Sequence, residues 1–209
     1  MNWITNKILS FMIRHKAISD NRDVVSFYRY GVEITISSFL NILLVLFIGI
    51  LLFHFSWAVA FLITFVFIRL TVGGYHADTY LRCNLIMCSV FLMVAFLSNL
   101  LTFKHISIPI FIIIFTSSMI IMFGPVDNPN KPVPADKRLY YKIISLVKSS
   151  IAGIVSMVLI INNNVIGTVI SFTLLFIAIL IIAAKIKEKK CKHGFTCNID
   201  PTLNQEYGN

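Results

Sequence analysis

A histidine and a cysteine, His76 and Cys83, are the residues of this chain whose types and spacing best suit covalent chemistry. A cysteine attacks as the thiolate, and a free thiol with a pKa of about 8.5 is only slightly ionised at neutral pH. A neighbouring imidazole can take the thiol proton and so raise the reactive fraction. The pair therefore fits a cysteine nucleophile activated by histidine. The alternative is an inert or lipidated thiol beside an unrelated imidazole, and spacing alone does not separate the two interpretations.

The seven-residue separation restricts how the two side chains can meet. In one continuous helix they would share a face but lie two turns apart, about 10–11 Å along the axis. A histidine that holds a thiolate needs contact at about 3–4 Å. Gly73 and Gly74 precede His76 and permit the backbone angles of a sharp turn. If the two residues act together, the segment must be broken before Cys83.

Two charged side chains flank the histidine. Asp78 is the nearest carboxylate that could orient the imidazole, although a loop carboxylate is more often solvated. Arg69 could pair with an acidic group of a substrate or with a lipid phosphate, and the phosphate is the simpler partner. The nine carboxylates are scattered, and the chain contains no HExxH motif and no glycine-rich phosphate loop. We therefore expect no metal and no cofactor.

Apolar stretches must position these residues. The chain of 209 residues is 57% hydrophobic and only 13% charged, which excludes an ordinary soluble enzyme and a disordered chain. A bilayer core about 30 Å thick requires about 20 helical residues. Six stretches approach this length: Ile34–Phe55, Ser56–Leu70, Leu85–Phe103, Ile106–Phe123, Ile143–Ile161 and Val165–Ala184. We predict an all-α integral membrane protein with six transmembrane helices, the second of them short.

Basic residues predict which side of the membrane the loops face. The net charge is +9, and 16 of the 18 Lys and Arg residues fall in the termini, in or beside loop 71–84, or in loop 124–142. Such residues favour the cytoplasmic side. Both termini and both loops, including His76 and Cys83, should therefore face the cytoplasm. The basic balance then favours the anionic inner leaflet as a partner over nucleic acid.

Three regions are expected: a cytoplasmic head at 1–30, a membrane domain at 31–185 and a basic tail at 186–209. In the head, residues 3–18 predict a basic amphipathic helix, because apolar residues recur there at helical spacing. Such a helix lies on the inner leaflet or packs on the cytoplasmic end of the bundle, and the sequence leaves both open.

Polar residues inside the predicted spans have structural interpretations. Ser37, Ser38 and Asn41 in the first span are predicted to form hydrogen bonds between helices. Cys88 in the third span is expected to pack as a small hydrophobic residue. The phenylalanine-to-tryptophan segment 53–57 is predicted to be a tight elbow, and the three asparagines at 162–164 a polar turn.

Two motifs resemble those of one bacterial family. The run Gly73-Gly74-Tyr75-His76-Ala77, followed by Cys83, resembles the signature of the accessory gene regulator B (AgrB) family, membrane cysteine endopeptidases that process quorum-sensing peptide precursors. The segment 123–134, which ends in Lys131-Pro132-Val133-Pro134, resembles a proline-containing loop of that family. Family members often carry more lysines where this chain has Asn128-Pro129-Asn130. The resemblance covers most of residues 1–185.

The resemblance implies a mechanism and a location. Cys83 would attack a carbonyl in the C-terminal part of an AgrD-like precursor while His76 takes the thiol proton, which gives a thioester. A side chain of the precursor, usually a cysteine, would then displace Cys83 and close a thiolactone ring. The residues expected to bind substrate or support the pair are Arg69, Gly73, Gly74, Asp78, Lys131 and Pro132. The enzyme would lie in the bacterial cell membrane. Independently of the resemblance, a homodimer is the favoured assembly, because small bundles with one cytoplasmic site often pair.

Two other classes compete with a peptidase. A transporter or export channel for a small peptide would need ionisable groups near mid-membrane, and the spans have almost none. A lipid transferase would need clustered acidic residues for a metal. Cys191 and Cys197 in the tail offer too few ligands for zinc.

Overall fold

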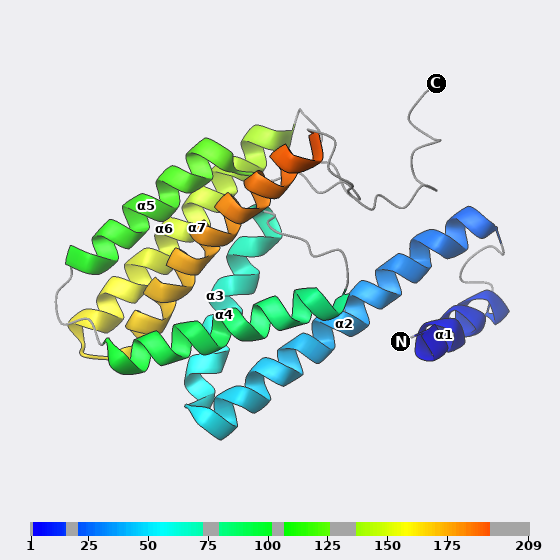
Figure 1. The fold of residues 1–209 in the computed structure, drawn as a ribbon, viewed down its shortest axis with the longest axis horizontal. Helices are drawn as coiled ribbons and strands as arrows, with labels where there is room; N and C mark the ends of the chain where they lie inside the picture. Colours follow the sequence, from blue (N-terminus) through cyan, green and yellow to red (C-terminus); the bar gives the residue numbers. More distant parts are fainter. Residues whose placement is uncertain (1, 16–20, 73–79, 102–106, 126–136, 193–209) are drawn as a thin grey trace.

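The computed structural model of the protein describes residues 2–15, 21–72, 80–101, 107–125 and 137–192. Within these ranges the chain forms seven α-helices and no strand. The helices are α1 (Asn2–Arg14), α2 (Arg22–Leu52), α3 (Phe55–Val72), α4 (Tyr80–Leu100), α5 (Ser107–Phe123), α6 (Arg138–Ile161) and α7 (Val165–Lys192) (Figure 1). The all-α class is therefore confirmed for the described chain.

Each of the six predicted apolar stretches overlaps one helix, and among the described residues four helices are long and apolar enough to cross a membrane. These candidate spans are Gly31–Leu52, Phe55–Val72, Arg138–Ile161 and Val165–Ile186. The apolar helices Asn84–Leu100 and Ser107–Phe123 are shorter. At about 1.5 Å per residue, seventeen residues extend about 25 Å, less than the hydrocarbon thickness of about 30 Å. The long apolar helices indicate that the protein is a membrane protein. That all six helices cross the membrane stays a prediction.

The predicted boundary between the first two spans is wrong by a few residues. α2 ends at Leu52, and Phe55 already begins α3, which runs on to Val72. α3 therefore has 18 residues and qualifies as a candidate span, whereas the sequence predicted a short helix. Hydropathy placed the end of this helix at Leu70, but the helix continues past Arg69 and Leu70 to Val72.

α7 lies at the centre of the bundle. It packs against α3, α4, α5 and α6, and its apolar segment is 61% buried, against 22% for the segment of α2. α5, α6 and α7 run side by side, while α2 and α4 form a second pair that extends away from them (Figure 1). The ring of Phe61 lies 5.3 Å from that of Phe65 and 5.2 Å from that of Phe91, so these aromatic residues join α3 to α4 in the core.

Two tight connections lie at the same end of the bundle. At the predicted elbow, a Cβ on Gly49 would lie 2.5 Å from that of Ala58, so α2 and α3 meet here without room for a side chain. At the polar turn, Asn163 adopts a φ of 54°, and Asn164 Oδ1 accepts a hydrogen bond of 3.0 Å from the Ile166 amide. Both predicted connections are confirmed.

Small residues let α6 and α7 approach closely. Ser156 Oγ donates to the Gly167 carbonyl at 2.7 Å and lies 2.6 Å from Ser171 Oγ. A Cβ on Gly167 would lie 2.6 Å from the Ser156 carbonyl oxygen, whereas a Cβ on Gly31 would meet nothing within 4 Å. Close approach through small residues is the usual way in which membrane helices associate.

We therefore expect Gly167→Ala to destabilise the protein by about 1–3 kcal/mol, because the backbones of α6 and α7 must separate. Gly31→Ala is the matched control, and its better helix propensity should leave stability unchanged or raise it by about 0.5–1 kcal/mol. Thermal unfolding of the two variants in detergent measures the difference. Equal melting temperatures would contradict this packing.

The predicted N-terminal helix is present as α1, which packs against α2. Thr5 and Leu9 are buried, while Lys7, Phe11 and Arg14 are exposed. α1 lies beside the N-terminal part of α2, away from α5, α6 and α7 (Figure 1). One face of α1 is therefore covered by protein, and the other carries basic and aromatic side chains.

Candidate active site

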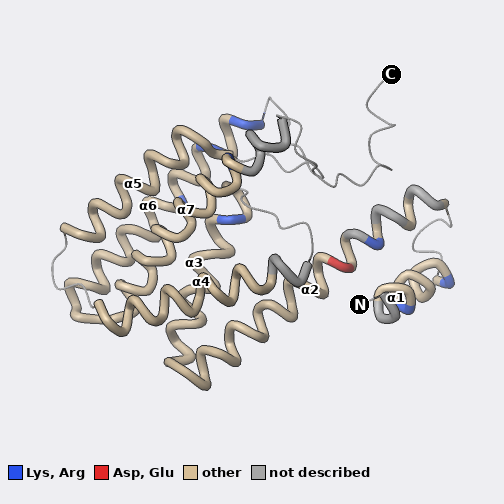
Figure 2. The backbone as a smooth tube through the Cα atoms, viewed as in Figure 1, with Lys and Arg blue, Asp and Glu red and all other residues tan. Residues whose placement is uncertain are grey.

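The described Lys and Arg residues lie away from the elbow and the polar turn. In the bundle they are Arg69, Lys137, Arg138, Lys142, Lys148 and Lys185. Figure 2 shows these cations toward the end of α3 and the start of α6, while the opposite end of the bundle is tan. Among the described residues, the end of the bundle that holds the elbow and the polar turn therefore carries no Lys or Arg.

Cys83 is the fourth residue of α4, so its backbone lies in the first turn of that helix. The first amides of a helix have no acceptor within the helix, and the helix dipole favours negative charge there. This turn is therefore a favourable place for a thiolate and for the oxygen of a tetrahedral intermediate. The Cys83 side chain and residues His76, Gly73, Gly74 and Asp78 lie outside what the structure describes, as do Lys131 and Pro132.

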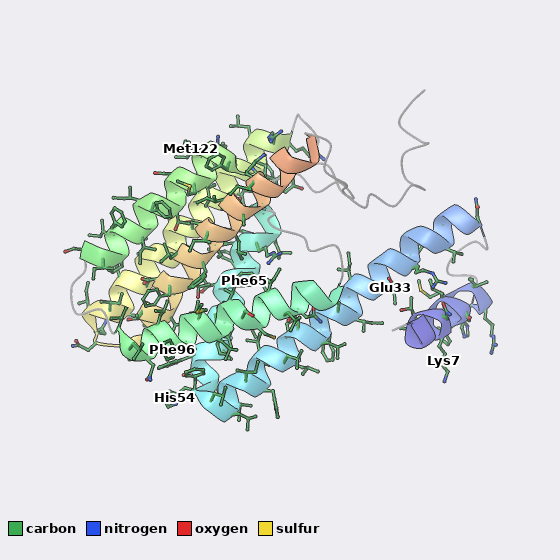
Figure 3. All side chains as sticks on the ribbon, in the orientation of Figure 1. Lys7, Glu33, His54, Phe65, Phe96 and Met122 are labelled. Carbon is green, nitrogen blue, oxygen red and sulfur yellow. The ribbon has the colours of Figure 1, made fainter. Side chains whose placement is uncertain are left out.

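Arg69 lies in the last turn of α3, directly before the segment that contains His76. Its guanidinium carbon lies 5.1 Å above the centre of the Phe65 ring, and the side chain is half-buried. A cation near a helix C-terminus also interacts favourably with the helix dipole. Packing against Phe65, which Figure 3 labels within α3, holds the stem of Arg69 at the end of this helix.

Lys148 ties α6 to the same end of α3, and the sequence analysis assigned it no role. Its Nζ donates to the Phe67 carbonyl at 3.0 Å and lies 4.6 Å from the centre of the Phe67 ring. A lysine within an apolar stretch is costly unless it finds polar partners. That cost is the signal by which sequence alone could have marked Lys148 as a contact between helices.

The start of α4 is joined to α2 by side-chain hydrogen bonds. Ser37 Oγ donates to Asn84 Oδ1 at 3.0 Å. One turn further on, Asn41 Nδ2 donates to Met87 Sδ at 3.2 Å, and Cys88 Sγ lies 3.9 Å from Asn41 Oδ1. The predicted bonds between helices are confirmed for two of the three residues.

Ser38 and Cys88 complete the comparison with the predictions for the spans. Ser38 is exposed, whereas the neighbouring Ser37 is buried and bonds Asn84. Cys88 is half-buried and packs against the core cluster, as expected for a small hydrophobic residue. Helical geometry explains why Ser37 faces α4 while Ser38 is exposed, because consecutive residues point about 100° apart around the axis.

The comparison with known protein families decides what these motifs are. The family model for accessory gene regulator B matches residues 5–181, which include both motifs. This chain belongs to the AgrB family. Its AgrB relatives include a putative AgrB-like protein of Clostridium perfringens strain SM101 / Type A, 27% identical over 141 residues, which are 64% of each chain. A putative AgrB-like protein 2 of C. perfringens strain 13 / Type A is 28% identical over 116 residues, 53% of this chain and 54% of that protein.

The alignments thus cover less than two thirds of the length of either AgrB-like relative. No solved structure matches the chain. The activity of the family therefore comes to this AgrB member as a proposal, supported by its own residues.

A depression in this AgrB chain lies at the end of the bundle that holds the elbow and the polar turn. It is shallow and polar, and it is lined by His54, Ser56, Trp57 and the start of α7 together with Asn162–Asn164. Figure 3 labels His54 at the elbow, where α3 begins, whereas Arg69 lies in the last turn of α3. This depression is therefore not the predicted active site.

Among the described residues, no group of three or more His, Cys, Asp or Glu could hold a metal ion.

Proposed function

We propose that this AgrB-family protein is a membrane cysteine endopeptidase that cleaves the C-terminal part of an AgrD-type quorum-sensing precursor. The observation that carries the proposal is the family match over residues 5–181, because that range contains the run 73–77, Cys83 and the proline-containing loop. The position of Cys83 in the first turn of α4 adds support from the structure.

In this mechanism Cys83 is the nucleophile and His76 is the base. His76 takes the thiol proton as the sulfur forms a bond to the peptide carbonyl carbon, and the oxygen becomes negatively charged. Backbone amides of the first turn of α4 are suitable donors to that oxygen. His76 then returns the proton to the departing amine as the peptide bond breaks. The product is a thioester between Cys83 and the truncated precursor.

The second step forms the ring. A thiol of the precursor attacks the thioester and gives its proton to His76. The new carbon–sulfur bond closes a thiolactone as the bond to Cys83 breaks, and Cys83 leaves as a thiolate beside the protonated imidazole. The exchange of one thioester for another is nearly balanced in energy, and an intramolecular thiol acts at a very high effective concentration. Water must be excluded so that hydrolysis does not compete. A site at the membrane boundary between apolar helices meets that requirement.

The remaining site residues have supporting roles in the proposal. Gly73 and Gly74 form the bend that brings His76 toward Cys83, and Asp78 orients the imidazole. Arg69, Lys131 and Pro132 contact the substrate or the lipid phosphates beside it.

The charge distribution supports a cytoplasmic site. The described cations of the bundle lie away from the elbow and the polar turn, and Lys and Arg favour the cytoplasmic side of a membrane. The start of α4 and the end of α3 would then face the cytoplasm. The exposed face of α1, with Lys7, Phe11 and Arg14, would contact the anionic inner leaflet.

Purified protein in lipid vesicles, incubated with a synthetic AgrD-type precursor, tests the proposal. Mass spectrometry should find a free C-terminal fragment and a cyclic product. The cyclic product should be one water lighter than the linear N-terminal fragment that hydrolysis would give. The competing function, a peptide transporter, predicts instead that intact precursor crosses the vesicle membrane. Recovery of uncleaved peptide only would overturn the peptidase assignment.

The other three cysteines should be dispensable. Cys88 packs in the core and the mechanism does not use it, and Cys191 and Cys197 lie in the basic tail. We expect the triple variant Cys88→Ser, Cys191→Ser, Cys197→Ser to keep its cleavage rate within about threefold, since only the Cys83 thiolate reacts. Loss of cleavage in a triple variant that still accumulates in the membrane would mean that the nucleophile is another thiol.

A further inference from the structure

The first turn of α4 is fixed in rotation by the residue that follows the proposed nucleophile. Asn84 is hydrogen-bonded to Ser37 of α2 at 3.0 Å, and the Ser37 side chain is buried at 6% exposure. Adjacent residues of a helix point about 100° apart around its axis. Holding the Asn84 side chain against α2 therefore fixes the direction in which the Cα–Cβ bond of residue 83 leaves the helix.

A second contact sets the register as well as the rotation. Asn41 lies one turn after Ser37 on α2 and is 5% exposed. It bonds Met87, which lies one turn after Asn84 on α4. Two contacts at the same helical spacing on both helices prevent α4 from sliding along α2 or turning about its own axis.

The two helices that flank the segment 73–79 are held by different partners. The end of α3 is tied to α6 by Lys148, whereas the start of α4 is tied to α2 by Ser37. The ring contact between α3 and α4, Phe61 with Phe91, lies eight residues after Cys83 on α4. Among the described hydrogen bonds, the bond to α2 therefore holds the start of α4, in addition to the packing of α4 against α7.

We infer that Ser37 and Asn84 are positioning residues for Cys83. Their hydrogen bond holds the first turn of α4, which contains Cys83, in one rotation and one register. The inference rests on the proposed function, in which Cys83 is the nucleophile. A displacement of about 1 Å at a reacting atom can cost about a hundredfold in rate. The Ser37–Asn84 bond should therefore matter more for the chemical step than for folding.

The test uses the Cys88→Ser, Cys191→Ser, Cys197→Ser background, in which Cys83 is the remaining cysteine of the chain. In that background Ser37→Ala and Asn84→Ala should lower the single-turnover cleavage rate at saturating precursor by about 10- to 100-fold, with KM changed by less than about threefold. The pH profile of Cys83 alkylation should shift in the same variants. Ser37→Thr, which keeps the hydroxyl, should restore the rate to within about threefold.

Ser156→Ala is the matched control for a lost buried contact. Ser156 bonds α6 to α7 through Gly167 and Ser171, away from α4. It should lower the thermal midpoint about as much as Ser37→Ala does and leave the cleavage rate and the alkylation profile unchanged. A cleavage rate in Ser37→Ala equal to that of the background, or an equal loss of rate in Ser156→Ala, would overturn the inference.

A reciprocal exchange covers the case in which a single variant does not accumulate. The double variant Ser37→Asn, Asn84→Ser offers the same donor and acceptor types across the two helices and should recover most of the rate. A folded double variant without this recovery counts against the positioning role. Failure of the proposed function itself would give a different result, because the Cys83→Ala variant would still cleave the precursor.

Discussion

Replacing Cys83 by alanine should abolish cleavage of the precursor. Cys83 is the proposed attacking atom, so its loss removes the covalent route and not merely one interaction in the transition state. Removal of a nucleophile of this kind lowers turnover by at least about 1,000-fold. The measurement is release of the C-terminal fragment in vesicles that contain equal amounts of variant and unaltered protein. The first turn of α4 should be undisturbed, because alanine is the best helix former.

Two comparisons make the Cys83→Ala result specific. The Cys88→Ser variant changes a thiol one turn and one residue further along the same helix, and it should cleave at nearly the unaltered rate. A transporter would keep most of its peptide movement after Cys83→Ala. Residual cleavage above about a tenth of the unaltered rate would remove Cys83 from the mechanism.

Replacing His76 by alanine should have the second largest effect. A general base that takes the thiol proton and returns it to the leaving amine contributes about 100- to 10,000-fold to the rate. Because a thiol is weakly ionised without a base, cleavage by His76→Ala should rise steadily with pH over the neutral range, following the thiolate fraction. The same single-turnover assay, run from pH 6 to about pH 9, measures both features.

Asp78→Asn is a suitable comparison for the histidine variant. If Asp78 only orients the imidazole, its amide should cost less than His76→Ala and keep the shape of the pH profile. A His76→Ala protein that accumulates normally and cleaves at the unaltered rate would show that another group activates the thiol.

The sequence predicted the helices well because hydropathy reports which stretches are apolar. It predicted their ends poorly, since a helix does not stop where its apolar part stops. α2 begins at Arg22, twelve residues before the predicted span, and α7 continues to Lys192. α6 begins at Arg138 and not at Ile143. In each case the extra turns carry charged residues, and backbone hydrogen bonds continue through them.

The pairing of helices could not be read from composition. Ser37 and Asn41 were recognised as bonding groups, but hydropathy does not say that their partners are Asn84 and Met87. Composition likewise does not show that Lys148 joins α6 to α3. Such contacts depend on which faces meet, and that is set by packing around α7 rather than by local sequence.

The candidate site, like the helices, could be predicted only in part from the sequence. The run 73–77 and Cys83 gave the chemistry and the family, because short motifs carry residue types at fixed spacing. The location of Cys83 in the first turn of a helix, and the fastening of that turn to α2, came from the structure.

Detection of the thioester on Cys83 tests the central claim most directly. A precursor whose ring-forming cysteine is replaced by alanine cannot pass the thioester on, so the adduct should accumulate. After acid quench and digestion, mass spectrometry should find the N-terminal part of the precursor attached to the peptide that contains Cys83, and hydroxylamine should release it. Complete cleavage with the adduct on another residue, or with no adduct at any time, would contradict the account.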